Sequence, residues 1–449
     1  MQGIAVAKTL LRCSNVDRIM IGLLARIFLL TLQLVCGSRV FAESALPWDA
    51  FESSPLPLAV PERDYRPIAV PNGQKAEYWI VDGVKVFHLV IEPIEWSVMP
   101  GLVVKAWGVN GSFPGPVIEV GVGDRVKIYV TNRLEAPTTI HWHGLRIPCG
   151  MDGVAYLTQP VIQPGETFLY TFVCPDSGTF MYHSHYDPMT QEGMGIVGMF
   201  IVQERISDPS KRPDRDYALL LHEWSVPIGT GRPNPNEMTD FNVLTINGRS
   251  FPATEPLEAW VGERVWIRYG NLSAMDHHPM HLHGHSFKVI GSDGGWVEDK
   301  HSLLPETTVL VPVGTTRVTE LIADNPGDWI LHCHMTHHTM NQMGHNSSNM
   351  ISVDAEKIDK AVKIWFPHFM AMGSRGMGPM GSMHMEGPKN AVSTKGSPLQ
   401  YGSTIMGGMA TVLKVRNADE SMAGWYRFSK TMQAHKVSSE DLRRDGIEE

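Results

Sequence analysis

The second half of this chain repeats the order of motifs found in the first half, and this internal repeat constrains the fold more than any other feature. Four segments match in sequence and in order. A repeat of this length indicates two domains of the same architecture. The matched pairs are residues 109–114 with 246–252, 122–128 with 261–267, 141–144 with 281–284, and 179–185 with 328–334.

Each half has the sequence pattern of a β protein. Residues 125–130 alternate between apolar and polar side chains after a Gly-Asp turn, and the strand-like run 167–172 follows a Pro-Gly turn. Short strands bounded by such turns are typical of β-sandwiches. Because the pattern repeats, it predicts an all-β fold of two Greek-key β-sandwich domains, at residues 85–205 and 206–355.

The stretch from His332 to Met343 carries the clearest metal chemistry. Side chains alternate along a strand, so His332 and His334 point to one face and Cys333 points to the other. His338 and Met343 follow at spacings that let a loop return them to the Cys333 side. A thiolate, imidazoles and a weak axial thioether form a blue-copper site. The alternative is a buried free cysteine between two histidines.

Three further His-x-His pairs, at residues 141–143, 183–185 and 281–283, bring the total to eight imidazoles. With these four motifs in this order, the sequence resembles the multicopper oxidases, which include laccases, ascorbate oxidase, cuprous oxidases and ferroxidases. The resemblance covers nearly everything except the two ends of the chain. It implies that both domains are cupredoxin domains and that four copper ions are bound.

The resemblance also implies a ligand for each copper. Ser184 stands in the first domain where Cys333 stands in the second, so only the second domain can hold the type 1 copper. The family's pattern assigns His278, Cys333 and His338 to type 1 copper with Met343 axial, His141 and His281 to type 2 copper, His143, His183 and His334 to one type 3 copper, and His185, His283 and His332 to the other.

The mechanism that the resemblance implies begins with a reducing substrate, which gives one electron at a time to the type 1 copper. The electrons pass through Cys333 to His332 and His334, and the three-copper cluster reduces O2 to water. Asp152 matches an acidic position that relays protons in the family. The alternative role for Asp152 is that of a turn residue before Gly153.

No middle domain separates the two halves, so the resemblance is to two-domain laccases with type 1 copper in the second domain. In those proteins, domain one of a subunit meets domain two of its neighbour, and three subunits close a ring. We therefore expect a homotrimer whose partners are O2 and a small reducing substrate or metal ion. A formal net charge of -9 argues against a nucleic-acid partner.

The ends of the chain differ from the repeats. Residues 1–42 have an apolar run and a small-residue cleavage site, which predict a signal peptide, and the run is too short for a membrane anchor. We expect an exported protein, periplasmic or secreted. Residues 43–84 predict an extended N-terminal arm. Residues 356–449 predict a C-terminal extension, in which the methionines of 370–385 are either soft Cu(I) ligands or part of a flexible linker.

Several functions fit these features. The leading prediction is a laccase-like oxidase of phenols, aromatic amines or Cu(I). Oxidation of Cu(I) would give the protein a role in copper homeostasis. A copper-binding or electron-carrier protein for copper tolerance is an alternative, although it needs no three-copper cluster. Copper nitrite reductase needs fewer histidines and carries its type 1 cysteine in the first domain. Cys149 and Cys174 can pair in an oxidising compartment or remain free.

Overall fold

The computed structural model describes residues 56–227, 229–299, 303–340, 397–404, 406–429 and 433–447, with the separate residues 357, 360, 361, 364, 365 and 390. The predicted signal peptide 1–42, the axial residue Met343 and the methionines of 370–385 lie outside these described residues. Among the helices of the described part, none is long and apolar enough to cross a membrane.

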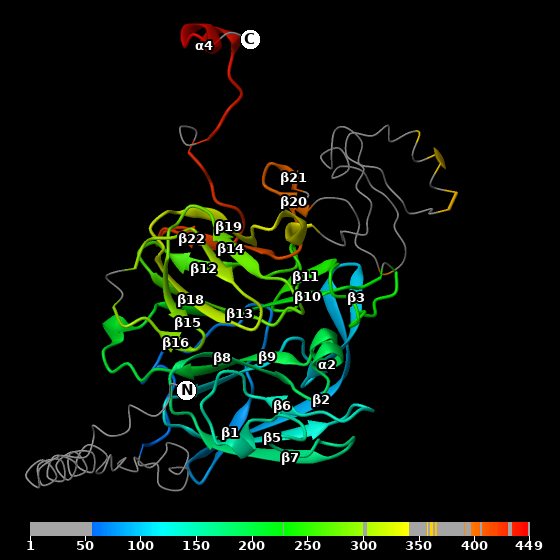
Figure 1. Ribbon diagram of the computed structural model, residues 1–449. Coiled ribbons are helices and arrows are strands. Elements are labelled where there is room, and N and C mark those ends of the chain that lie inside the picture. Colours follow the sequence, from blue (N-terminus) through cyan, green and yellow to red (C-terminus); the bar gives the residue numbers. More distant parts are fainter. Residues whose placement is uncertain are drawn as a thin grey trace, which may run out of the picture. The chain divides into compact units, whose positions relative to one another are not determined.

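The first sandwich consists of two sheets around one apolar core, which we call core 1 (Figure 1). Outer sheet 1 has the order β1-β2-β5-β7, with β3 paired to β2, and inner sheet 1 has the order β4-β9-β8-β6. Helix α2 (Pro188–Met194) connects β8 to β9. The strands are β1 Tyr78–Val81, β2 Val84–Met99, β3 Leu102–Val109, β4 Gly115–Gly121, β5 Arg125–Asn132, β6 Ile140–His141, β7 Thr167–Val173, β8 Gly178–Ser184 and β9 Val197–Gln203.

The second sandwich encloses core 2 in the same way. Inner sheet 2 has the order β11-β10-β13-β18-β15-β16, and outer sheet 2 has the order β12-β22-β19-β14-β17. The strands are β10 Arg215–Trp224, β11 Val243–Ile246, β12 Leu257–Trp260, β13 Arg264–Asn271, β14 His278–Leu282, β15 Lys288–Ser292, β16 Gly295–Trp296, β17 Thr308–Val311, β18 Thr316–Ile322, β19 Gly327–Cys333 and β22 Ala410–Arg416. Three 3-10 turns (Cys149–Met151, Pro209–Lys211, Thr336–Thr339), the hairpin of β20 (Ser397–Leu399) and β21 (Gly402–Thr404), and helix α4 (Ser439–Arg444) complete the described elements.

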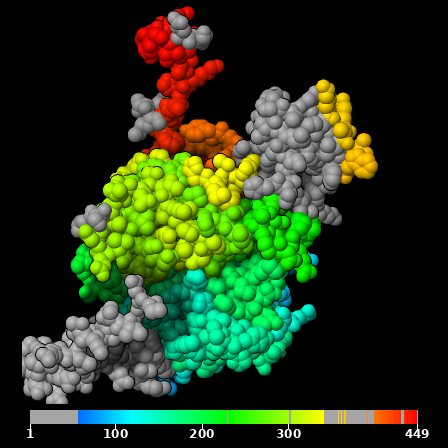
Figure 2. Space-filling model, in the orientation of Figure 1, coloured from blue at the N-terminus to red at the C-terminus, as the bar shows by residue number. Residues whose placement is uncertain are grey.

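The two inner sheets face each other across a third core. In β9, Phe200 and Val202 belong to core 1, whereas Met199 and Ile201 belong to the core between the sandwiches. Strand β10 alternates in the same way between that core and core 2. The layers therefore follow in the order outer sheet 1, inner sheet 1, inner sheet 2, outer sheet 2. In Figure 2, the surfaces of the two sandwiches adjoin along their contact, cyan to green below and yellow-green above.

The two sandwiches repeat the same pairing, and this confirms the predicted all-β fold. In the first, β9 pairs antiparallel with β8 and parallel with β4. In the second, β22 pairs antiparallel with β19 and parallel with β12. Strand β22 thus belongs to the second sandwich, although it lies in the segment 356–449 that was predicted to be an extension beyond it. The sandwich continues past residue 355 because its last strand follows a long insertion.

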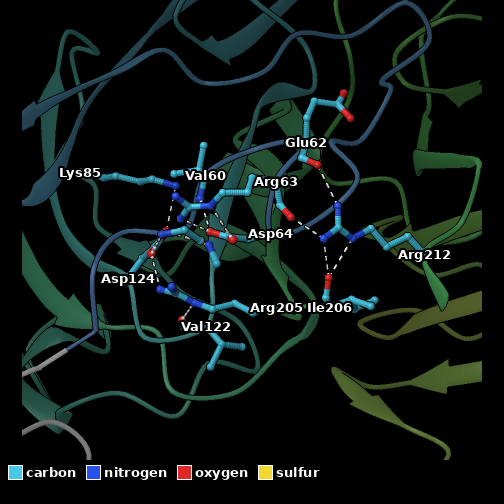
Figure 3. Close-up of polar contacts among 12 residues, drawn as sticks. Val60, Glu62, Arg63, Asp64, Lys85, Val122, Asp124, Arg205, Ile206 and Arg212 are labelled. Atoms are coloured by element: carbon cyan, nitrogen blue, oxygen red, sulfur yellow. Dashed lines mark hydrogen bonds and ion pairs between the residues drawn. The ribbon is translucent and has the colours of Figure 1, made fainter. Parts of the chain in front are cut away.

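The arm is joined to the first sandwich by a buried carboxylate (Figure 3). Asp124 is fully buried, accepts a hydrogen bond from the backbone N–H of Ala59 in the arm at 2.8 Å, and forms ion pairs with Lys85 at 2.8 Å and Arg205 at 3.1 Å. Breaking one partner of a buried ion pair typically costs about 3–5 kcal/mol, because the other charge is left uncompensated. The arm is described from residue 56, and β1 lies within its predicted range.

Candidate metal centres

Three elements bring His278, Cys333 and His338 together, and we call these residues the type 1 group. His278 begins β14, Cys333 ends β19, and the 3-10 turn at Thr336–Thr339 returns His338 to the sheet. The Cys333 Sγ lies 3.4 Å from His338 Nδ1 and 3.7 Å from His278 Nδ1, and the two Nδ1 atoms are 3.2 Å apart. Two nitrogens and one sulfur converge in this way around a single copper ion in blue-copper sites. The donor set therefore fits copper.

The other edge of each imidazole is held by a second hydrogen bond. Ser273 Oγ lies 2.7 Å from His278 Nε2, and Asp276 Oδ2 lies 3.2 Å from His338 Nε2. Such partners fix the tautomer and leave the Nδ1 lone pair for a metal. Burial, with the nearby His338, lowers the pKa of His278 to about 3, so this imidazole is neutral at physiological pH. Burial raises the pKa of the Cys333 thiol to about 12, so a metal must displace its proton.

Four imidazoles of the first sandwich form a second group, the first imidazole set. His143 Nδ1 lies 3.1 Å from His183 Nε2, and the ligand atoms of His141, His143 and His183 all lie within 4.8 Å of one another. Burial, with the nearby His183, lowers the pKa of His143 to about 4. Burial alone would lower the pKa of His183, but the Glu192 carboxylate at 3.0 Å outweighs it and raises that pKa. The members are His141, His143, His183 and His185.

The second imidazole set has the same arrangement in the second sandwich. His283 Nε2 lies 3.2 Å from His332 Nε2, and His281 is oriented by the Thr307 carbonyl oxygen at 2.8 Å from its Nδ1. The members, His281, His283, His332 and His334, have ring centroids 4.8–5.6 Å apart. Their type and spacing suit metal ligation as those of the first set do.

The two imidazole sets do not meet in one chain. Leu331 and Cys333 belong to core 2, so alternation along β19 places His332 and His334 on the opposite face of outer sheet 2, which points out of the layered stack. The first set comes from β6, β8 and their flanking loops at inner sheet 1. Inner sheet 2 lies between them, and packed sheets are about 10 Å apart. Among the described residues, every ring contact of these eight imidazoles stays within its own set.

Asp152 lies in a tight turn beside the first imidazole set. It ends the 3-10 turn Cys149–Met151, and its backbone carbonyl accepts a hydrogen bond from His141 Nδ1 at 2.8 Å. Its carboxylate Oδ1 lies 3.4 Å from the same nitrogen, and about a third of its side chain is exposed. Gly153 follows at φ +91°, where a Cβ would overlap the Ile140 carbonyl. The chain is therefore tightly turned here, with the acid beside the first imidazole set.

Eleven of the twelve predicted metal ligands lie in these three groups, and Met343 lies outside the described residues. Sequence reasoning missed the acids that hold the imidazoles, Glu192 at His183 and Asp276 at His338. Each lies near a His motif in sequence, which is the only signal that could have found them. Cys149, exposed, and Cys174, buried, are both free thiols, so the structure has no disulfide between them.

Comparisons with known proteins agree with this chemistry. Residues 90–207 and 227–350 match two family models, both described as multicopper oxidase. The Nitrosomonas europaea blue copper oxidase is similar in structure, with a TM-score of 0.54 and 27% identity over 74% of this chain and 85% of that one.

Two curated relatives match over part of their length. Copper resistance protein A of Escherichia coli is 28% identical over 43% of this chain and 39% of its own length. Laccase-19 of Oryza sativa subsp. japonica is 33% identical over 49% of this chain and 39% of its own. This chain thus spans about two fifths of the length of these relatives. The two family matches cover more than half of the sequence, and with the copper-type ligand groups they establish that this chain belongs to the multicopper oxidase family, whose cofactor is copper.

Proposed function

We propose that this protein couples one-electron oxidation of a small reducing substrate to the four-electron reduction of O2 to water. The observation that carries this proposal is the position of Cys333. Its thiol belongs to the type 1 group inside core 2, while its neighbours in sequence, His332 and His334, belong to the second imidazole set on the opposite face. Bound copper would supply one-electron transfer at the first group and oxygen reduction at the second. A single peptide unit on either side of Cys333 connects the two.

The cluster is completed between subunits of a homotrimer in this proposal. The second imidazole set lies on an outward sheet face, and His283 and His334 are exposed. Apolar side chains beside both sets are also exposed. Tyr156, whose ring contacts that of Tyr186 next to His185, is 76% exposed, and Leu310, on the strand that pairs with β14, is 52% exposed. Exposed apolar groups that gather around a functional site mark an interaction surface. A second copy that places its first set against this second set would bury these side chains and supply the missing ligands.

Electrons enter at His338. Its Nδ1 faces the Cys333 sulfur, whereas its Nε2 faces the partly exposed Asp276. The substrate is a phenol, an aromatic amine or Cu(I). Soft thioethers in residues 370–385 favour Cu(I), and one curated relative is named a copper resistance protein. The apolar run and cleavage site in residues 1–42 support export to the periplasm or the outside of the cell.

Oxygen uptake by the copper-loaded protein tests this function. With Cu(I) or a dimethoxyphenol we expect catalytic uptake in which four electrons are consumed for each O2 and no peroxide accumulates. Without a reductant we expect none. A copper carrier would take up no O2 beyond the oxidation of its own metal, and a nitrite reductase would turn over with nitrite instead. Either result would contradict the proposal.

Asp152 is proposed to relay protons to the first imidazole set. Asp152→Asn keeps the side-chain size and removes the acid, so we expect O2 reduction to slow about 10²–10⁴-fold, the usual contribution of a positioned proton donor. Reduction of the type 1 group by substrate should be nearly unchanged, because Asp152 lies in the other sandwich. Single-turnover reoxidation of the reduced protein measures the first rate and stopped-flow bleaching the second. An unaltered reoxidation rate would leave Asp152 as a turn residue only.

A further inference from the structure

The two sandwiches can be superposed strand by strand around the metal groups, because their strand registers are the same. Val197, the first residue of β9, pairs with His183 of β8. Ala410, the first residue of β22, pairs with His332 of β19. His183 and His332 occupy matching positions in the internal repeat. Val197 and Ala410 are therefore structural equivalents, as are the residues that precede them, Ile196 and Met409.

The backbone confirms that Ile196 and Met409 are equivalent. In the first sandwich, the Ser184 N–H donates to the Ile196 carbonyl oxygen at 3.2 Å. In the second, the Cys333 N–H donates to the Met409 carbonyl oxygen at 3.0 Å. Both Ile196 and Met409 are fully buried, Ile196 in core 1 and Met409 in core 2 beside Cys333.

The side chains at these two positions differ together. In the first sandwich, Ser184 is hydrogen-bonded through its backbone to Ile196. In the second sandwich, a cysteine and a methionine, Cys333 and Met409, occupy these two positions. Serine and isoleucine are poor copper ligands, whereas a thiolate and a thioether are soft ligands that copper prefers. The paired change places a second sulfur beside the only cysteine that lies in a ligand group of the described residues.

Met409 is also tied to the third member of the type 1 group. Its N–H donates to the His338 carbonyl oxygen at 2.9 Å, and the Gly407 N–H donates to the Thr339 carbonyl oxygen at 2.7 Å. Gly408 has φ +57°, and a Cβ there would overlap the His338 carbonyl oxygen. The returning chain thus runs against the His338 turn with no room for a side chain at residue 408.

We propose that Met409 supplies the axial thioether of the type 1 copper, in place of Met343. The proposal rests on the function proposed above, since it assumes a copper ion in the type 1 group. This assignment means that a long insertion separates the axial ligand from Cys333 in the sequence. In the first sandwich, residues 185–195 connect the equivalent positions, whereas in the second, residues 334–408 do so and include the methionine-rich segment. The axial ligand is then the residue where the chain re-enters the sheet.

Met280 offers a matched control, because it too is fully buried in core 2 and pairs with Cys333 across β14 and β19. Its equivalent in the repeat is Ile140, an ordinary core residue of the first sandwich. Strand pairing to Val309 and Cys333 holds its backbone inside the sheet. A thioether that only fills the core should be replaceable by leucine without effect on a metal.

The test compares Met409→Leu, Met409→Gln, Met280→Leu and Met343→Leu in the copper-loaded full chain. The readouts are the visible and electron paramagnetic resonance spectra and the reduction potential of the type 1 copper. A thioether donates electron density to Cu(II), so Met409→Leu should raise the potential. Met409→Gln supplies a harder oxygen donor and should lower it. Met280→Leu and Met343→Leu should leave spectra and potential at the wild-type values.

Each result decides the proposal. If Met409→Leu does not retain type 1 copper, Met409→Gln gives the answer through its shifted spectrum. Wild-type spectra and potential in Met409→Gln, or a shift in Met343→Leu or Met280→Leu of the size expected for Met409, would overturn the assignment. A wild-type protein that binds no blue copper would instead contradict the proposed function itself, so the two failures can be told apart.

Discussion

Cys333→Ser is expected to remove the blue colour and the oxidase turnover while leaving the cluster copper bound. The copper content of the assembled protein should fall from four ions per chain to three. The thiolate is the source of the intense absorption and the covalent start of the connection to His332 and His334, whereas the eight imidazoles are untouched. Absorption spectra, metal analysis and O2 uptake measure the three effects. A variant that stays blue would refute the assignment of the type 1 group.

The fold should tolerate this substitution, because the first sandwich already has serine at the equivalent position. Ser184 is fully buried there and makes the same backbone hydrogen bond that Cys333 makes. Cys174→Ser is the matched control. Cys174 is also a fully buried free thiol, but it lies in core 1 and in none of the three ligand groups. Colour and turnover should be retained in that variant, so loss of both in Cys333→Ser reports on the metal site.

The sequence predicted the sandwiches and most of the residues that gather in the three groups, because both depend on local patterns. Period-2 strands and turn residues recur in each half, and His-x-His at strand ends fixes which side chains share a face. The placement of His332 and His334 opposite Cys333 followed from alternation alone, and the structure confirms it.

Features that depend on distant parts of the chain could not be predicted in this way. Nothing in the local sequence of residues 410–416 shows that they enter outer sheet 2 next to β19. Met343 had the spacing of an axial ligand, whereas the position of Met409 depends on where the chain returns. The layer order, with inner sheet 2 between the two imidazole sets, depends on which strand faces pack together. Glu192 and Asp276 contact imidazoles through the same tertiary packing.

The separation of the two imidazole sets leads to the second large effect, which is complementation between inactive variants. His143→Ala damages the first set and His334→Ala damages the second, so each protein alone should lose O2 reduction. In a mixed ring, an interface is intact when its first set comes from a His334→Ala subunit and its second set from a His143→Ala subunit. Random co-assembly of equal amounts in a cyclic oligomer should therefore restore about a quarter of the interfaces. Co-expression and measurement of O2 uptake per copper-loaded trimer test this.

The matched control is co-expression of His143→Ala with His185→Ala, because both variants damage the first set. No interface in such a ring can receive an intact first set, so activity should stay at the level of the single variants. A cluster built within one chain predicts no rescue in either mixture, since every chain carries a defect. Rescue in the first mixture alone would therefore place the cluster between subunits. A monomer by light scattering of active protein would rule that arrangement out, because a monomer has no second subunit to supply the other imidazole set.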